Sequence, residues 1–375
     1  MPGLTLIDDT LERRLGDFRR RLMRLSAAAL ALLLLATDSG ASPALTYTAT
    51  WYSQVYNVDG IYKSMQGPAS AQRIRLAKLP SQELLWVVGY QTEIVDAGKT
   101  QTLTPDFMCH NNLNIADLDD HRKRFPWPQG AKRVFTLSQG QMEVQFPKGF
   151  GIPVLSDEPL TINTQVLNHN LEDASLQVRH KTSVRFLRDS ELTTPMKALY
   201  QQGVQSLILL EGKDGHFHGR GDHQTTQGAE CSIGKPVGLQ KDVTDPEGRV
   251  FNGHWVVEPG LEERRTRVTP YLQLATDTTV HYIAIHLHPF AVSLELRDLT
   301  EDTTLFKSST RNSSDQIGLE HVEHYSSVDG IPFARDHEYE LVSIYNNTSG
   351  EPQDAMAVMF LYHHDARFVK PDLAH

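Results

Sequence analysis

Two histidines and a methionine are the residues of this chain whose types and spacing could do chemistry. A single residue, Leu287, separates His286 from His288, and Met356 follows later in the chain. Imidazole suits copper and zinc, whereas the soft thioether of methionine favours copper, above all Cu(I). The three side chains together therefore predict a copper site with redox chemistry. The alternative is structural, because a His-x-His pair can lie on a half-exposed strand face and a methionine can simply fill a core.

Two predicted strands would have to position these three side chains. The histidines end the apolar run 280–288, and Met356 opens a second apolar run, 356–362. Successive side chains of a strand point to opposite faces of the sheet, so both histidines should share one face. Ile283, Ile285 and Leu287 would then take the other face, toward a core. We expect the second run to be a neighbouring antiparallel strand that brings the Met356 sulfur to the two imidazoles.

The N-terminal residues have the composition of an export signal. Arg19–Arg21 and Arg24 precede an apolar run from Leu25 to Ala36, and small residues follow. This is the order of a basic region, a short hydrophobic region and a cleavage zone, and the run is too short to span a membrane. We predict a signal segment at 1–41, export to the periplasm or the extracellular space, and no stable membrane span after removal. A short buried or membrane-anchoring helix is the alternative.

Charge and cysteine content limit the possible partners and covalent links. The formal net charge of the chain is −10. An acidic protein is a poor partner for nucleic acids and for anionic membranes, so neither is expected. The two cysteines, Cys109 and Cys231, could form one disulfide in an exported protein or could remain unpaired, and the sequence leaves both possibilities open. Cys109 precedes His110, which keeps a metal or redox role open for this pair.

The whole chain favours an all-β fold. Short apolar stretches recur from Trp51 onward between segments rich in Gly, Pro, Asn and Asp, and long amphipathic helical patterns are scarce. Many short strands separated by turns are typical of antiparallel sandwiches. We predict two antiparallel, jelly-roll-like β-sandwich domains in tandem after the signal segment, at 45–200 and 201–367, with the polar stretch 211–245 near the boundary. The second domain would hold all three residues of the copper site.

The second half resembles a known family. The segments 253–260 (GHWVVEPG), 286–288 (HLH) and 354–360 (DAMAVMF), with 294–298 (LELRD) between them, are similar to the C-terminal domain of the copper type II, ascorbate-dependent monooxygenases. Peptidylglycine α-hydroxylating monooxygenase and dopamine β-hydroxylase belong to this family. The resemblance implies that His286, His288 and Met356 hold the copper that activates oxygen. It names no catalytic residues beyond these metal ligands.

The first half resembles the family through 146–151 (FPKGFG) and 164–170 (TQVLNHN), so the resemblance covers about residues 85 to 365. In the family this domain holds a second copper through a His-His pair and a further histidine, and this copper stores an electron. Here the chain reads Met108-Cys109-His110-Asn111-Asn112, with one histidine of the pair remaining. The resemblance therefore makes His110 and His169 candidates for a degenerate second site.

Three functions remain open from the sequence. The first is an exported copper-dependent monooxygenase that hydroxylates a C–H bond of a small molecule or peptide with O₂ and an external reductant such as ascorbate. The second is a mononuclear copper-binding or copper-handling protein on the same scaffold without monooxygenase activity. The third is a metal-free binding module in which the two histidines are ordinary polar groups.

Overall fold

The computed structural model describes residues 45–125, 132–172, 175–209, 243–244, 250–272 and 274–373. Strands dominate this part of the chain, so the all-β prediction is confirmed. The short helical elements are η1 (Pro105–Phe107), α2 (Leu118–Arg124), η2 (Asp189–Glu191) and α3 (Thr269–Leu272). In the same described part, no helix is long and apolar enough to cross a membrane. The predicted signal segment 1–41 lies outside the described residues.

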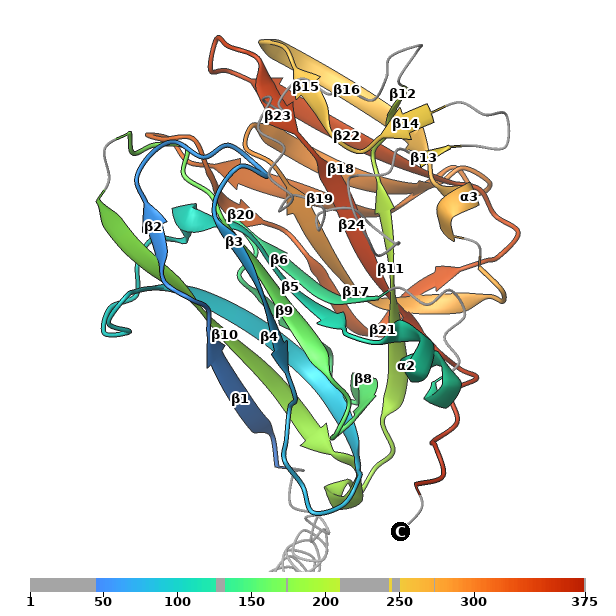
Figure 1. Ribbon diagram of the computed structural model, residues 1–375. Helices are drawn as coiled ribbons and strands as arrows, with labels where there is room; N and C mark the ends of the chain where they lie inside the picture. Colours follow the sequence, from blue (N-terminus) through green and yellow to red (C-terminus); the bar gives the residue numbers. More distant parts are fainter. Residues whose placement is uncertain are drawn as a thin grey trace, which may run out of the picture. The chain divides into compact units, whose positions relative to one another are not determined.

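The largest sheet passes through both halves of the sequence (Figure 1). Its main path, in spatial order, is β1 (Tyr47–Tyr52), β10 (Leu176–Arg188), β4 (Leu84–Asp96), β8 (Phe150–Leu155), β11 (Lys197–Gln205), β24 (Ala357–His364), β17 (Thr278–Leu287) and β21 (Tyr325–Phe333). Two short strands pair beside this path, β2 (Tyr56–Val58) with β10 and β7 (Glu143–Gln145) with β4. The pairs are antiparallel except for a short parallel contact between β11 and β8.

Two further sheets cover this one. The first contains β3 (Ala69–Ile74), β9 (Leu160–Val166), β5 (Met108–Ile115) and β6 (Arg133–Ser138). The second contains β16 (Gly260–Arg267), β22 (Tyr339–Asn347), β18 (Ala291–Asp298), β19 (Thr303–Asn312) and β20 (Leu319–Val322). Short strands form two small sheets, β15 (Trp255–Val257) with β23 (Gln353–Ala355), and β12 (Ile208–Leu209) with β14 (Val250–Asn252) and β13 (Val243–Thr244).

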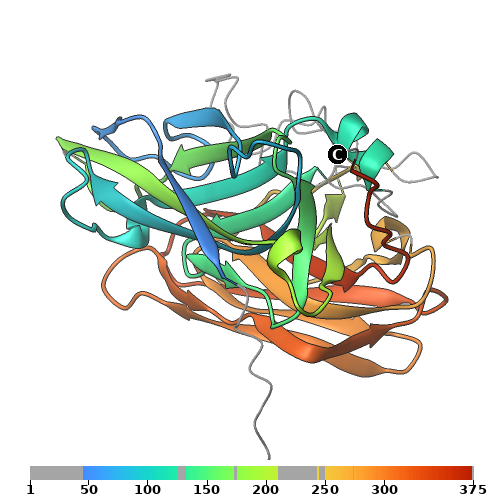
Figure 2. The same cartoon turned by 90° about the horizontal axis from the view of Figure 1, so that it is seen from below.

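Strands β17 and β24 contribute to two hydrophobic cores at once. Tyr282 and Phe360 pack with first-half residues such as Phe135 and Phe146 in the first core. On the opposite face, the predicted core residues Ile283, Ile285 and Leu287 pack into the second core with strands of the five-stranded sheet. Figures 1 and 2 show these strands between the first-half strands and the second-half sheet. The face that carries the histidines is therefore as buried as the other, which explains why both strands are nearly continuous apolar runs.

Aromatic contacts close the space between the two halves next to this face. The rings of Phe146 and Tyr362 have centroids 4.9 Å apart, and those of Phe146 and Tyr282 are 5.7 Å apart. The Tyr362 hydroxyl donates a hydrogen bond of 3.0 Å to the Val134 carbonyl of β6. First-half side chains thus pack directly on the second-half strands that carry the predicted metal ligands.

The predicted domain boundary near residue 200 falls inside β11. This strand pairs along its length with β24 of the second half, and its first residues contact β8 of the first half. The largest sheet therefore continues from one half to the other, and residues 45–375 form one compact unit. The division into domains at 45–200 and 201–367 stays a prediction.

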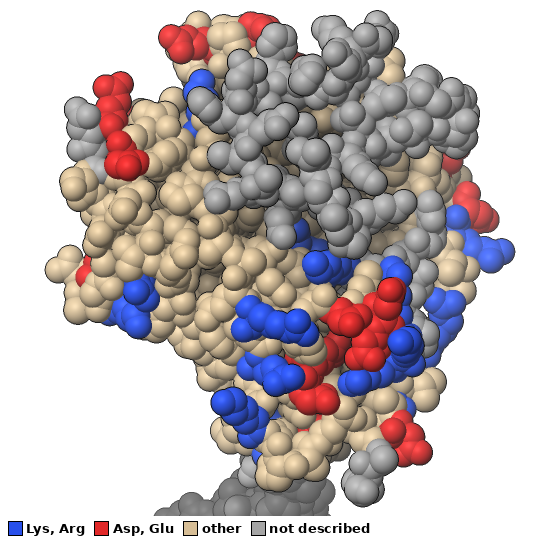
Figure 3. All heavy atoms as spheres, in the orientation of Figure 1, with Lys and Arg blue, Asp and Glu red and all other residues tan. Residues whose placement is uncertain are grey.

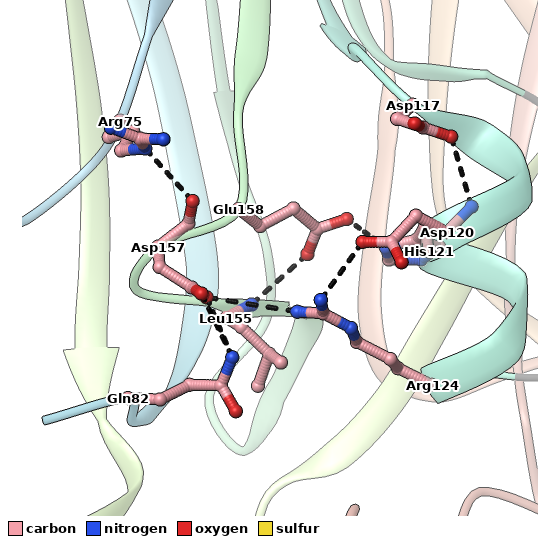
Figure 4. A network of polar contacts seen from close by, with 9 residues as sticks. All are labelled: Arg75, Gln82, Asp117, Asp120, His121, Arg124, Leu155, Asp157 and Glu158. Carbon is pink, nitrogen blue, oxygen red and sulfur yellow. Dashed lines mark hydrogen bonds and ion pairs between the residues drawn. The ribbon is translucent and has the colours of Figure 1, made fainter.

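A buried hydrogen bond between His121 and Glu158 attaches α2 to the strands beneath it (Figure 4). His121 Nδ1 lies 2.5 Å from Glu158 Oε1, and both side chains are buried. The other carboxylate oxygen of Glu158 accepts a hydrogen bond of 3.1 Å from the Leu155 backbone N–H. Asp117 caps the helix by accepting from the Asp120 N–H at 3.0 Å. These contacts anchor α2 to the connection between β8 and β9.

Opposite charges are interspersed on the surface. On the face in Figure 3, basic and acidic side chains lie beside one another. Ion pairs in the described part of the chain include Arg188 with Glu83 at 2.8 Å and Lys370 with Asp189 at 2.8 Å. Such partly exposed pairs contribute little to the free energy of unfolding, typically about 0 to 1 kcal/mol each.

Candidate metal centre

The two predicted histidine ligands lie at the end of β17, deep inside the molecule. His286 is 4% exposed and His288 is 5% exposed. Their rings are neighbours, with centroids 5.4 Å apart and planes at 80°. They share the sheet face of Tyr282 and Ala284, as the alternation of the strand predicts. His286 lies in the part of β17 that pairs with β24, and His288 directly follows the last residue of the strand.

Met356 reaches the same place from the neighbouring strand. In the antiparallel register, His286 faces Val358 and Leu287 faces Ala357. Continuing this register by one pair sets Met356 opposite His288, and opposed side chains on one face have Cβ atoms about 5 Å apart. The Tyr345 hydroxyl joins the two backbones, because it accepts from the His288 N–H at 3.3 Å and donates to the Met356 carbonyl at 2.7 Å. Met356 is 1% exposed, in the first core.

His286 is a buried histidine without hydrogen bonds at its ring. Neither Nδ1 nor Nε2 has a hydrogen-bond partner, which is also true of the buried His363 on β24. Burial, followed by the charges of His288, His110 and His254, lowers the pKa of His286 well below its ordinary value. The ring is therefore neutral over the physiological pH range, which is the form that binds a metal ion. Two unsatisfied ring nitrogens destabilise the fold, and a metal ligand bond would satisfy the acceptor nitrogen of the two.

His288, by contrast, is held at both ring nitrogens. Its Nδ1 lies 3.3 Å from Asp354 Oδ2 and 3.2 Å from the Asp354 carbonyl oxygen. Its Nε2 lies 3.2 Å from the Ser64 hydroxyl, which belongs to the first half. Burial lowers the pKa of His288, but the hydrogen bond and charge of Asp354 outweigh it, so that the pKa is raised overall.

A third imidazole stands beside this pair. The ring of His254 has its centroid 5.7 Å from that of His288, and its Nδ1 lies 3.8 Å from Asp354 Oδ1. The pairing of β15 with β23 brings them together, because Val256 faces Asp354 in that register. Burial raises the pKa of Asp354, but hydrogen bonds and charges of His254 and His288 lower it more, so the carboxylate stays ionised.

The two tentative residues of the second site lie on β5 and shortly after β9, which pair with each other, and a shared site stays a prediction. His110 is buried on β5 and lines a small pocket together with His286, Asn112, Arg133, Thr136 and Phe360. His169 is not among the residues that line this pocket. It follows β9, and burial together with the charge of His288 lowers its pKa to about 4. The structure thus brings His110 toward His286, and His169 toward His288.

Cys109 is buried at an irregularity of β5, where the pairing with β9 shifts between Met108 and His110. Cys109 acts to raise the pKa of His169, although burial and His288 outweigh this effect. Its possible partner Cys231 lies outside the described residues. Whether the two cysteines form a disulfide stays a prediction.

Three residues of this centre were missed by reasoning from the sequence. Asp354 carried a signal, since it lies two residues before Met356 and has the same alternation, and a carboxylate next to a ligand histidine is a common arrangement. His254 lies in the segment that resembles the monooxygenases, but nothing in the sequence pairs it with Asp354. Ser64 lies in a turn of the first half and carried no signal.

The donor set is compatible with copper on physical grounds. Within the described ranges, no group of three or more His, Cys, Asp or Glu side chains is placed to hold a metal ion. The copper set has two such side chains, and its third donor is a thioether. The two unsatisfied nitrogens of His286 fit a metal because the ring of His288 lies beside them, whereas His363, whose nitrogens are also unsatisfied, packs against Tyr200 and Phe333.

Comparison with known proteins identifies no family. No family model matches the chain, and no curated protein matches it. Similar solved structures include VP54 of PBCV-1, fitted into a reconstruction of the virophage Sputnik, at 8% identity over 91% of this chain and 99% of that chain, with a TM-score of 0.33. PNGase F, a glycosylasparaginase from Flavobacterium meningosepticum, is 7% identical over 88% of this chain and 100% of that chain, with a TM-score of 0.34. At such TM-scores these similarities carry no conclusion about activity.

Proposed function

We propose that this chain is an exported copper-dependent monooxygenase, with copper held by His286, His288 and Met356. The observation that carries the proposal is the neighbourhood of two buried imidazoles, His286 and His288, of which His286 has both ring nitrogens unsatisfied. Copper bound there would supply the one-electron redox chemistry needed to hydroxylate a C–H bond of a small molecule or peptide with O₂ and a reductant such as ascorbate.

The residues around this set would orient the ligands and exclude water. Tyr345 fixes the end of β17 against the end of β24 through hydrogen bonds to both backbones. Asp354 holds the ring of His288, and a ligand histidine is commonly oriented in this way by a carboxylate. First-half side chains cover the histidine-bearing face. A dry site of this kind strengthens electrostatic interactions with bound groups.

The second candidate function is a mononuclear copper-binding or copper-handling protein without monooxygenase activity. One observation favours it: His110 lines a pocket with His286, whereas His169 responds to the charge of His288. The two residues that resemble a second copper site are thus each directed toward the first site. A monooxygenase of the family type would need another source for its second electron.

Measurements of copper binding and of turnover distinguish these two candidate functions. The purified chain is titrated with Cu(I) in competition with a chromophoric chelator, and oxygen consumption is then followed with ascorbate. We expect one tightly bound copper, lost in His286→Ala and retained in His281→Ala, a control on the same strand whose ring nitrogens are both hydrogen-bonded. Oxygen consumption that depends on bound copper supports the enzyme, and binding without it supports the alternative. Binding that is unchanged in His286→Ala rejects both.

A further inference from the structure

We propose that Asp354 fixes His288 as the tautomer protonated at Nδ1, so that Nε2 is its ligand atom, and that the Ser64 hydroxyl caps this nitrogen until a metal ion takes it. The inference rests on the proposed function insofar as the metal is copper. It assigns a positioning role to Asp354 and a competing role to Ser64, a residue from the other half of the chain. Neither role follows from the set of three ligands.

The tautomer follows from what surrounds Nδ1. Two oxygens of Asp354 face this atom, Oδ2 at 3.3 Å and the backbone carbonyl at 3.2 Å. A backbone carbonyl oxygen can only accept a hydrogen bond, whatever the charge of the side chain. Nδ1 must therefore carry a proton. In the neutral ring Nε2 is then the acceptor, and the hydrogen bond of 3.2 Å to Ser64 is donated by the hydroxyl.

Asp354 is itself fixed in position. It lies in β23, where its backbone faces Val256 of β15. Its second carboxylate oxygen is directed toward His254 Nδ1, at 3.8 Å. The carboxylate therefore lies between two imidazoles and has little freedom to leave His288. Held in this way, it limits rotation of the His288 ring and directs Nε2 away from β23.

Ser64 occupies the direction in which a metal ion would bind to His288. A metal ligand bond and a hydrogen bond from Ser64 both use the single lone pair of Nε2 in this tautomer. The two are therefore mutually exclusive. Ser64 is 8% exposed and precedes Met65, whose φ of 67° is in the left-handed region. The hydroxyl keeps Nε2 satisfied before metal binding, and binding must first break this hydrogen bond.

The two residues should thus affect metal affinity with opposite signs. Asp354→Asn removes the negative charge and can present an amide N–H to Nδ1, which favours the wrong tautomer. Loss of such an orienting partner typically lowers metal affinity about 10- to 100-fold. Ser64→Ala removes the competitor for Nε2, so the affinity should rise about five-fold, the equivalent of one ordinary hydrogen bond.

The test combines NMR of the metal-free protein with Cu(I) affinity. Nitrogen-15 spectra of metal-free wild type, at a pH where His288 is neutral, should show protonated Nδ1 and unprotonated Nε2 for this ring. Cu(I) affinities are then measured for Asp354→Asn and Ser64→Ala. Asp298→Asn is a matched control, because Asp298 lies 2.6 Å from Nδ1 of His337 in another carboxylate–histidine pair. Ser206→Ala is a second control, a buried serine bonded to Ser343. Neither control should change the affinity.

The outcomes separate this inference from the proposed function. A His288 ring protonated at Nε2, or affinities that fall in both Asp354→Asn and Ser64→Ala, overturns the roles given to these two residues even if copper binds. A wild-type chain that binds no copper, yet shows the Nδ1-protonated ring in the metal-free spectra, overturns the proposed function and supports the tautomer assignment. Opposite changes in the two variants, with unchanged controls, support both.

Discussion

Replacing His286 by leucine should make the metal-free protein more stable. A neutral imidazole has one N–H donor and one acceptor nitrogen, and neither of those of His286 has a partner. Each unsatisfied buried polar atom costs about 1–3 kcal/mol. Leucine has a similar volume and no polar atom, and the face around position 286 includes Ala284, Val358 and Phe360. We therefore expect His286→Leu to raise the free energy of unfolding by about 2–4 kcal/mol, less any packing strain.

The measurement is urea unfolding of metal-free wild type and variant, with thermal unfolding as a second assay. An increase of this size should raise Tm by roughly 4 °C or more. His281→Leu on the same strand is the matched control. The ring of His281 bonds Thr279 Oγ1 at 2.7 Å and the Ser327 carbonyl at 3.1 Å, so its loss should lower stability by about 1–3 kcal/mol.

If His286→Leu raises and His281→Leu lowers the free energy of unfolding of the metal-free protein, His286 serves a purpose other than stability. Added copper should make His281→Leu the more stable of the two variants, because copper binding stabilises only a protein that keeps the site. If metal-free His286→Leu is destabilised as much as His281→Leu, then His286 is a satisfied structural residue and the reasoning is refuted.

Two further predictions concern stability away from the metal centre. His121→Leu leaves the buried Glu158 side chain without its hydrogen bond to His121 and should cost about 1–3 kcal/mol in urea unfolding, whereas adding Glu158→Gln should recover part of this loss; equal stability of the single and double variants would contradict it. Burial lowers the pKa of His180 and of His363 to about 3, from an ordinary 6.5. Below pH 6.5 the unfolded chain then binds protons that the folded chain does not. Each ring should therefore reduce the free energy of unfolding by up to about 1.4 kcal/mol per pH unit as the pH falls toward 3. A free energy of unfolding that stays constant between neutral pH and about pH 5 would contradict this.

The strand-level features of the site could be predicted from the sequence because strands have a strict period. Alternation places His286 and His288 on one face and Ile283 on the other, and the structure confirms both. The second apolar run is expected to be a neighbouring antiparallel strand that brings Met356 to the histidines, and the antiparallel pairing of β17 with β24 is confirmed. The burial of the histidine face was not predicted, because no local pattern shows which first-half residues, such as Phe146, pack across it.

The surroundings of the ligands could not be predicted because they depend on contacts between distant segments. Ser64 and His288 are separated by most of the chain and meet only through packing of the two halves. His254 approaches Asp354 through a pairing of two three-residue strands, which are too short to have a pattern of their own. His110 likewise comes to line the same pocket as His286 only through the packing of β5 against the second half.

X-ray absorption of the Cu(I)-loaded protein tests the central claim most directly, because it reads the atoms bound to copper. The account predicts a shell of imidazole nitrogens with one sulfur, and the sulfur should disappear in Met356→Leu. It should persist in Met359→Leu, because Met359 lies three residues later, in β24, and packs in the second core. A copper shell without sulfur in the wild type, or a sulfur that survives in Met356→Leu, would contradict the assignment of His286, His288 and Met356 as the copper ligands.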